Sequence, residues 1–162
     1  MKNKKARVLH IIPRMVSSPE GIFVGGSVNA LLNLVKSTEN NFEHIIYTHT
    51  DKGLKKLFGE VWKNVAKIYV DETPMHPGSI VYGIYFLFRG IIIGLRYRAW
   101  NADVIAGHSG FAPYGLLTMM LGKILRRPSM HFLYCPVSND GFIKTKLCYY
   151  SLIFNDKILC MS

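Results

Sequence analysis

The chain has 162 residues, 49% of them hydrophobic, and its 20 lysines and arginines against 10 aspartates and glutamates give a formal net charge of +10. This apolar content offsets the entropy of ordering the chain, so the composition excludes a disordered tail, a collagen-like repeat and a disulfide scaffold. We expect one globular domain over residues 1–162. The positive charge predicts an anionic partner, with nucleic acid, a lipid surface and a phosphorylated small molecule as alternatives.

The cysteines and the N-terminal segment both indicate in which cellular compartment the protein is found. The three cysteines are odd in number and form no C-x-x-C pair, so neither a zinc site nor a disulfide framework is expected and a reducing cytosol fits best. The charged N-terminus resembles a signal peptide, but the apolar run over residues 8–12 is interrupted by His10 and stopped by Pro13. That run is too short for export. We therefore expect a cytoplasmic protein.

Apolar strands and helices alternate along the chain. Residues 7–12 form a β-branched run that predicts a buried strand. After a polar, glycine-containing loop, residues 27–36 carry apolar side chains at helical spacing, and Ser27 is placed to cap the first turn. Further strands are expected at residues 44–48, 67–70, 103–106, 129–134 and 157–161. Further helices are expected at residues 54–64, 80–95, 112–125 and 143–154.

This alternation predicts an α/β fold. Apolar strands separated by helices of this length indicate a doubly wound, Rossmann-like parallel sheet that is covered on both faces. In such folds ligands bind beyond the carboxyl ends of the strands. The segments at that edge are residues 13–26, 107–113 and 134–141, and we expect the functional site there.

A glycine pair, Gly25 and Gly26, stands just ahead of the first predicted helix. Residues 21–27 nearly spell a P-loop, but the lysine that would reach the phosphates is absent, so ATP or GTP hydrolysis is not expected. The glycines do not fit a dinucleotide-binding fingerprint either, because that motif follows directly after the strand, whereas here about a dozen residues lie between them. Glycines at a helix N-terminus bring bare amide groups close to a ligand, which suits a phosphate or an oxyanion. The alternative is that they only form a tight helix entry.

Four segments in chain order resemble the family-four retaining glycosyltransferases of the GT-B fold. They are residues 10–13 with 25–36, residues 103–110, residues 121–128 and residues 154–162. GT-B enzymes hold their substrates between two Rossmann-like domains, and the resemblance covers only the first. It implies that the chain is a single GT-B amino-terminal domain, on the acceptor side. The carboxyl-terminal donor-binding domain would be missing from a fragment, or would be a separate subunit.

The resemblance also implies an activity and a donor site. It implies a hexosyltransferase that moves a sugar from a nucleotide diphosphate sugar to a glycan or a lipid-linked acceptor, without a cofactor or a bound metal. Carried onto matching positions, it assigns Gly25, Gly26 and the adjoining Ser27 to the diphosphate, and Arg14 to donor or acceptor. Amide groups aimed at the diphosphate would stabilise the negative charge that grows there as the sugar leaves.

The acceptor side departs from the family pattern. Many relatives place a histidine at the end of the fifth strand, where this chain has Tyr134 or Cys135, and His131 lies three residues too early. Tyr134 is our catalytic candidate at that point, able to donate a hydrogen bond to a sugar or to stack on it. Packing at the strand end is the alternative. Cys135 is a further binding candidate, but the sequence offers no basic partner that would make it a nucleophile.

Histidines are candidates elsewhere in the chain. His108, the second catalytic candidate, and Ser109 follow a predicted strand and are expected to contact acceptor or donor, with a solvent-facing turn as the alternative. His10 lies inside a strand and is expected to be a hydrogen-bonded core residue. His44 and His49 have no partners at metal-ligand spacing. No metal site is therefore expected.

The run over residues 80–95 is the most apolar part of the chain. It falls short of the ~20 residues that span a membrane. We expect a helix buried against the sheet, its glycines allowing close contact. The alternative is partial immersion in an anionic bilayer surface, helped by the basic residues Arg96, Arg98, Lys123, Arg126 and Arg127. No nucleic-acid-binding module frames these residues. The alternative to an enzyme is a non-catalytic binding or scaffold protein that keeps the fold.

Overall fold

A computed structural model describes most of the chain, namely residues 5–13, 16–18, 21–23, 26–51, 67–75, 79–108, 112–133 and 142–160. The strands in these ranges are β1 (Ala6–Ile11), β2 (Val16–Ser18), β3 (Gly21–Phe23), β4 (Phe42–Thr50), β5 (Lys67–Glu72), β6 (Val104–His108), β7 (Ser129–Leu133) and β8 (Lys157–Cys160). The helices are α1 (Gly26–Thr38), α3 (Ile80–Arg96), α4 (Ala112–Leu125) and α5 (Phe142–Ile153), with a 3-10 turn, η1 (Arg98–Asn101).

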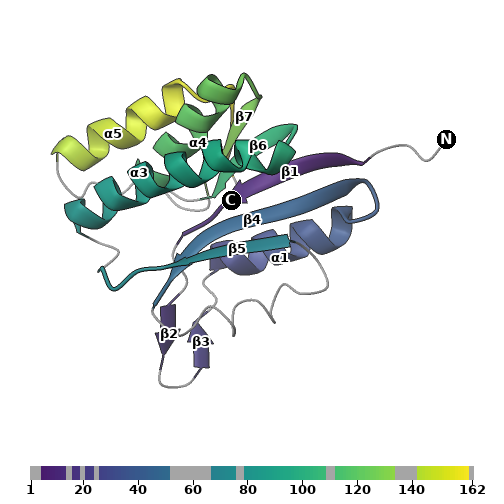
Figure 1. Cartoon of the computed structure of the whole chain (residues 1–162), viewed down its shortest axis with the longest axis horizontal. Helices are drawn as coiled ribbons and strands as arrows, with labels where there is room; N and C mark the ends of the chain where they lie inside the picture. Colours follow the sequence, from purple (N-terminus) through teal and green to yellow (C-terminus); the bar gives the residue numbers. More distant parts are fainter. Residues whose placement is uncertain are drawn as a thin grey trace.

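Six of the strands form one parallel sheet in the order β5-β4-β1-β6-β7-β8. The chain moves outward from β1 through β4 to β5, and then crosses back by way of α3 to β6 on the other side of β1 (Figure 1). The strand order therefore reverses between β1 and β6, which is the point where doubly wound folds bind their ligands. The α/β, Rossmann-like fold expected from the sequence is confirmed.

The two faces of the sheet carry separate cores, because successive side chains of a strand point to opposite faces. Leu9 and Ile11 of β1 belong to the cluster with α3 and α4. Ile12, just beyond β1, and Ile46 of β4 belong to the cluster with α1, which includes the buried Leu31. In Figure 1, α3, α4 and α5 lie on one side of the sheet and α1 on the other. His10, between Leu9 and Ile11, thus belongs to the α1 face.

Glycines bring α3 and α4 together. Gly90 and Gly94 are buried on α3. A Cβ added at Gly90 would lie 2.4 Å from Leu117 Cδ2, and one added at Gly94 would lie 2.7 Å from Leu121 Cδ2. The glycines thus allow a close approach, as expected, but the approach is to α4 and not to the sheet. The opposite side of α3 differs from that expectation, because several of its large apolar side chains are exposed.

The structure also corrects the predicted elements. The stretch predicted as a loop over residues 14–26 contains an antiparallel hairpin of β2 and β3, whose strands of three residues are too short to give a periodic pattern. The predicted helix over residues 54–64 lies outside the described residues. Among the helices that are described, none is long and apolar enough to cross a membrane.

Candidate functional site

The carboxyl ends of β1 and β6 meet where the strand order reverses, and α1 starts at the same edge of the sheet. Ile11, the last residue of β1, is the register partner of Gly107 on β6, and His108 ends β6. After the hairpin the chain enters α1 at Gly26, and the first turn of α1 contains no acidic residue. The N-terminal end of a helix carries unpaired amide groups and a partial positive charge, so this end of α1 suits an anion.

Only part of the predicted site falls within the described residues. Gly26 and Ser27 are the first two residues of α1, so the helix begins one residue earlier than predicted and Ser27 lies inside it and not at its cap. His108 was expected just past a strand that ended at residue 106, but it is the last residue of β6 and its side chain has no exposed surface, so the solvent-facing turn is wrong. The remaining predicted site residues lie outside the described residues: Arg14, Gly25, Ser109, Tyr134 and Cys135. Their roles, and contact between His108 and a sugar, stay predictions.

His108 belongs to a row of three buried histidines on adjacent strands, which we call the histidine row: His44 on β4, His10 on β1 and His108 on β6. His108 Nε2 lies 2.8 Å from His10 Nδ1, and His10 Nε2 lies 3.0 Å from His44 Nδ1. The other ring nitrogen of His44, Nε2, lies 3.1 Å from Thr38 Oγ1 at the end of α1. His10 is therefore the hydrogen-bonded core residue that the sequence predicted.

Register explains how the three rings meet. His10 is the register partner of Ile46 and Ala106, so His44 lies two residues nearer the amino edge of the sheet and His108 two residues nearer the carboxyl edge. The row therefore runs diagonally across the α1 face and ends at the edge where ligands bind. The ring centroids are 5.2 Å apart between His10 and His44, and 5.0 Å apart between His10 and His108.

Burial keeps these rings neutral. Desolvation, with a smaller repulsion from His44, lowers the pKa of His10 to about 3. Desolvation also lowers the pKa of His108 well below its ordinary value. Burial lowers the pKa of His44, and a hydrogen bond with the backbone of Thr38 offsets part of that lowering. The ring of His108 also stacks on Phe132, with centroids 4.6 Å apart.

Sequence reasoning missed the histidine row, because its members meet only through the pairing of distant strands. His44 and His108 follow His10 by 34 and 98 residues along the chain, so no local spacing connects the three. His10 and His44 fall within predicted strands, but the strand predicted over residues 103–106 ended two residues before His108, so the sequence pattern did not connect the three histidines. The described residues contain no cluster of three or more histidines, cysteines and carboxylates that could hold a metal ion.

His49, at the carboxyl end of β4, lies on the other face of the sheet. Its Nε2 is 2.8 Å from the hydroxyl of Tyr47 and 4.0 Å from the carboxylate of Asp71. Asp71 is held in turn by Arg89 of α3, at 2.8 Å. The ring packs against Phe86, with centroids 4.6 Å apart. His49 is thus a fully buried histidine with its own partners, separate from the histidine row.

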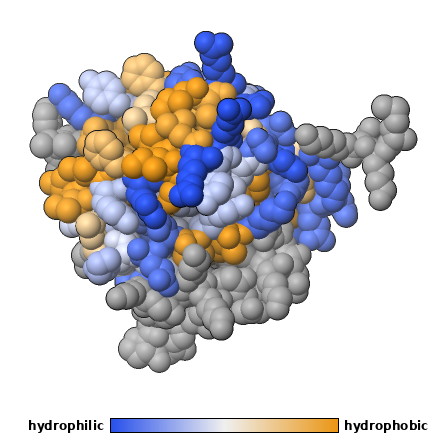
Figure 2. Space-filling view, in the orientation of Figure 1, coloured by the Kyte–Doolittle hydropathy of each residue, from blue (hydrophilic) through white to orange (hydrophobic). Residues whose placement is uncertain are grey.

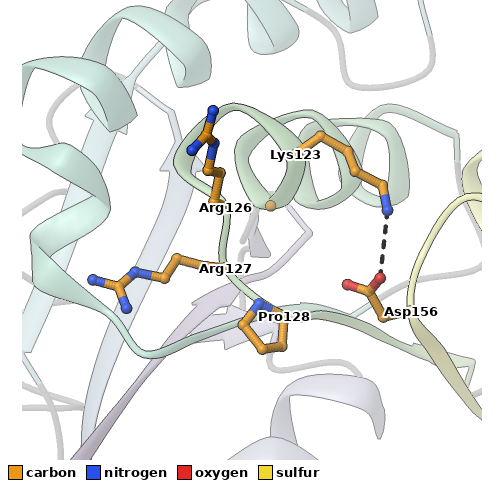
Figure 3. Close-up of a pocket in the computed structure, with 6 residues that line it drawn as sticks. Lys123, Arg126, Arg127, Pro128 and Asp156 are labelled. Carbon is orange, nitrogen blue, oxygen red and sulfur yellow. Dashed lines mark hydrogen bonds and ion pairs between the residues drawn. The ribbon is translucent and has the colours of Figure 1, made fainter.

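A basic hollow lies where α4 ends and β7 begins. It has a volume of about 470 Å³ and is lined by Gly122, Lys123, Arg126, Arg127, Pro128 and Asp156. Figure 3 shows Lys123 pointing toward Asp156, at 3.4 Å, while the two arginines point away from that pair. Asp156 also accepts hydrogen bonds from the backbone N–H and the hydroxyl of Ser129. The hollow is at the amino edge of the sheet, opposite the ligand edge.

Comparison with known proteins gives the fold but not a family. No family model matches the chain, and no curated protein matches it. Among solved structures, a UDP-GlcNAc 2-epimerase from Methanocaldococcus jannaschii matches with a TM-score of 0.60 at 13% identity, over 96% of this chain and 39% of that one. Another UDP-N-acetylglucosamine 2-epimerase matches with a TM-score of 0.64 at 10% identity, over 97% and 42%.

A third solved structure shares the fold. MurG from Acinetobacter baumannii matches with a TM-score of 0.55 at 16% identity, over 93% of this chain and 40% of that one. The likeness shows the fold alone: the chain is built like one half of these proteins, and it spans about two fifths of their length.

Proposed function

We propose that this chain is the acceptor-side half of a GT-B glycosyltransferase. In this proposal it is a retaining hexosyltransferase of the family-four type, which transfers a sugar from a nucleotide diphosphate sugar to a glycan or a lipid-linked acceptor. A second half, as a domain or a subunit, supplies most of the contacts to the nucleotide. The observation that carries the proposal is the likeness of the whole described fold to one half of MurG and of the epimerases.

The start of α1 supports this function physically. Gly26 begins α1 near the reversal of strand order, where amide groups without a nearby Cβ can approach a diphosphate. Negative charge grows on the diphosphate as the bond to the sugar breaks. Amides already directed at that charge stabilise the transition state more than the ground state. The protein therefore needs neither a nucleophile nor a metal at this point.

Assaying the natural gene product, purified together with any companion subunit, tests the proposal. Its intact mass shows whether the donor half is part of the same polypeptide. Radiolabelled UDP-N-acetylglucosamine and UDP-glucose are then offered with a glycan and lipid extract as acceptor. We expect transfer by the complete protein and none by residues 1–162 alone. Transfer by the isolated chain contradicts the division of the enzyme into two halves. Absence of transfer by the complete protein with any nucleotide sugar contradicts the proposed glycosyltransferase activity.

We further propose that the protein works at the cytoplasmic face of an anionic membrane, docked through α3. The exposed side of α3 carries a row of apolar side chains at helical spacing, the apolar stripe: Ile80, Ile84, Phe88, Ile92 and Leu95. Figure 2 shows hydrophobic side chains gathering over the layer that contains α3. A stripe of this kind lies at the boundary between headgroups and acyl chains when basic side chains flank it.

Basic side chains lie at the ends of the same helices. Arg96 ends α3, Arg98 lies in η1, and Arg126 follows α4. The turn η1 contacts both α3 and α4, which brings these cations to one end of the helical layer. Each lysine or arginine near an anionic leaflet contributes about 1 kcal/mol of attraction. Charge therefore favours a bilayer over an uncharged protein surface as the partner of the apolar stripe.

Cosedimentation with lipid vesicles tests the membrane proposal. We expect binding to vesicles that contain phosphatidylglycerol, and little binding to phosphatidylcholine alone. Replacing Phe88 and Ile92 together by aspartate should weaken binding by about 100-fold or more, since each large apolar side chain contributes roughly 1.5–3 kcal/mol when buried. Ile158→Asp on β8, where the side chain is 42% exposed, is the control. Equal binding by the double variant and the wild type refutes the docking face.

A further inference from the structure

Charge is unbalanced in the basic hollow at the end of α4. Its described lining residues include three cations but a single carboxylate, that of Asp156. Hydrogen bonds from the backbone N–H and the hydroxyl of Ser129 lower the pKa of Asp156, so the carboxylate is ionised at neutral pH. It pairs with Lys123 at 3.4 Å, whereas neither Arg126 nor Arg127 forms an ion pair with any other residue that the structure describes. The hollow thus keeps the charge of two guanidinium groups.

The turn after α4 presents two consecutive arginines. The N–H of Arg127 donates to the carbonyl of Gly122 at 2.9 Å, and the N–H of Arg126 donates to the carbonyl of Lys123 at 3.3 Å. This is the pattern of a Schellman motif, in which glycine usually occupies the left-handed position. Here Arg126 occupies it, with a φ of 54°, although a Cβ is unfavourable there. Strained positions of this kind gather at functional sites.

The same turn occupies groups that would repel an anion. The C-terminal end of a helix exposes carbonyl groups and a partial negative charge. In α4 the carbonyls of Gly122 and Lys123 accept the two N–H groups of the turn. Only glycine permits this arrangement, because a Cβ at Gly122 would lie 2.8 Å from Ser129 Cβ and 3.1 Å from the carbonyl oxygen of Arg127. Positive charge therefore dominates at this end of α4.

Size and chemistry favour a phosphate group as the ligand. A guanidinium group donates two parallel hydrogen bonds to a phosphate, and such charge-assisted bonds are stronger than neutral ones. The volume of about 470 Å³ lies within the range of small-molecule sites. Within the described part of the chain, the lining includes no aromatic side chain on which the bases of a nucleic acid would stack. Both arginines are exposed, and exposed side chains change rotamer rapidly, so both can turn toward an anion.

We propose that the basic hollow is a second anion site, which binds a phosphate group between Arg126 and Arg127. The hollow is at the amino edge of the sheet, whereas α1 starts at the carboxyl edge, so this site is separate from the proposed donor site. The phosphate belongs to a soluble phosphorylated molecule or to a lipid headgroup. Binding at this site depends neither on sugar transfer nor on docking through α3.

Titration of the ¹⁵N-labelled full chain with inorganic phosphate at constant ionic strength tests the site. We expect saturable shifts of the amide signals of Arg126 and Arg127. Arg126→Gly removes one cation and suits the left-handed backbone, so the variant should fold and bind phosphate more weakly by about 10-fold or more, as when a charge-assisted hydrogen bond is lost. Arg127→Gln should weaken binding similarly. Lys36→Gln, which removes an exposed cation of α1 on the other side of the sheet, is the matched control and should bind as the wild type does.

Vesicles distinguish the two sources of the phosphate group. Phosphatidic acid and phosphatidylglycerol are compared in phosphatidylcholine vesicles of equal surface charge. A preference for phosphatidic acid that Arg126→Gly and Arg127→Gln abolish identifies a lipid headgroup. Saturable phosphate shifts without that preference identify a soluble molecule. Absence of both results, or binding that the folded variants retain at wild-type strength, overturns the proposal.

Discussion

Buried histidines make the stability of this protein sensitive to mild acid. The pKa of His10 falls from 6.5 in the unfolded chain to about 3 in the folded protein, because burial disfavours the charged ring. Burial likewise lowers the pKa values of His44 and His108. Above pH 6.5 the rings are neutral in both states. Below it the unfolded chain binds protons that the folded chain does not, so the free energy of unfolding decreases as the pH falls toward 3.

Urea unfolding at a series of pH values measures this effect. The free energy of unfolding should drop by as much as about 1.4 kcal/mol per pH unit for each of the three histidines. Glu43, whose pKa is lowered chiefly by hydrogen bonds from Lys67 and Arg7, adds its own loss only below its ordinary value of 4.5. The histidine effect is therefore isolated between pH 6.5 and 5. A constant free energy of unfolding across that interval contradicts neutral, buried rings.

Asp156 holds the start of β7 through hydrogen bonds rather than through its ion pair. Its carboxylate accepts from the backbone N–H of Ser129 at 2.7 Å and from the Ser129 hydroxyl at 2.9 Å. Asp156→Ala should lower the free energy of unfolding by about 1–2 kcal/mol, discounted for partial exposure. Lys123→Ala, which removes only the exposed pair at 3.4 Å, should change it by less than about 0.5 kcal/mol. Equal effects in chemical denaturation contradict this division.

At the scale of elements, the contact between α3 and α4 depends on the absence of side chains at two glycines. Gly90→Leu should lower the free energy of unfolding by about 2–3 kcal/mol, because its side chain must displace the buried Leu117. Gly83→Leu is the matched control on the same helix, since nothing lies within 4 Å of its Cβ position. Because leucine has a higher helix propensity than glycine, Gly83→Leu should leave the free energy of unfolding unchanged or raise it slightly. Thermal unfolding that affects both variants equally speaks against a glycine-mediated contact.

Periodicity could predict elements but not which of their faces is covered. The helix over residues 112–125 was predicted with its observed bounds, because its apolar side chains and its flanking turns agree. For α3 the sequence is apolar on all sides, so the pattern indicated burial, whereas Phe88 is 67% exposed. The hairpin of β2 and β3 was missed because its local pairing depends on backbone bonds within a polar stretch.

At the scale of the whole molecule, the order of strands and helices was predictable, and the ligand edge followed from it. The start of α1 at Gly26 and the end of β6 at His108 both lie where the doubly wound topology predicts a site. The network below that edge was not predictable, since His44, His10 and His108 meet only through the parallel register of three strands. Such long-range contacts leave no local periodic signal.

We propose that the amide groups at the start of α1 stabilise the departing diphosphate, and turnover by the complete enzyme is the sharpest test of that role. Sugar transfer is compared between the wild type, Gly26→Leu and Gly83→Leu, with thermal unfolding measured in parallel. We predict that Gly26→Leu, whose side chain would keep the diphosphate away from the amide groups, lowers kcat by about 100-fold or more, a loss like that of an oxyanion-hole donor, while the fold and the control variant are unaffected. Undiminished transfer by a folded Gly26→Leu protein would contradict the account.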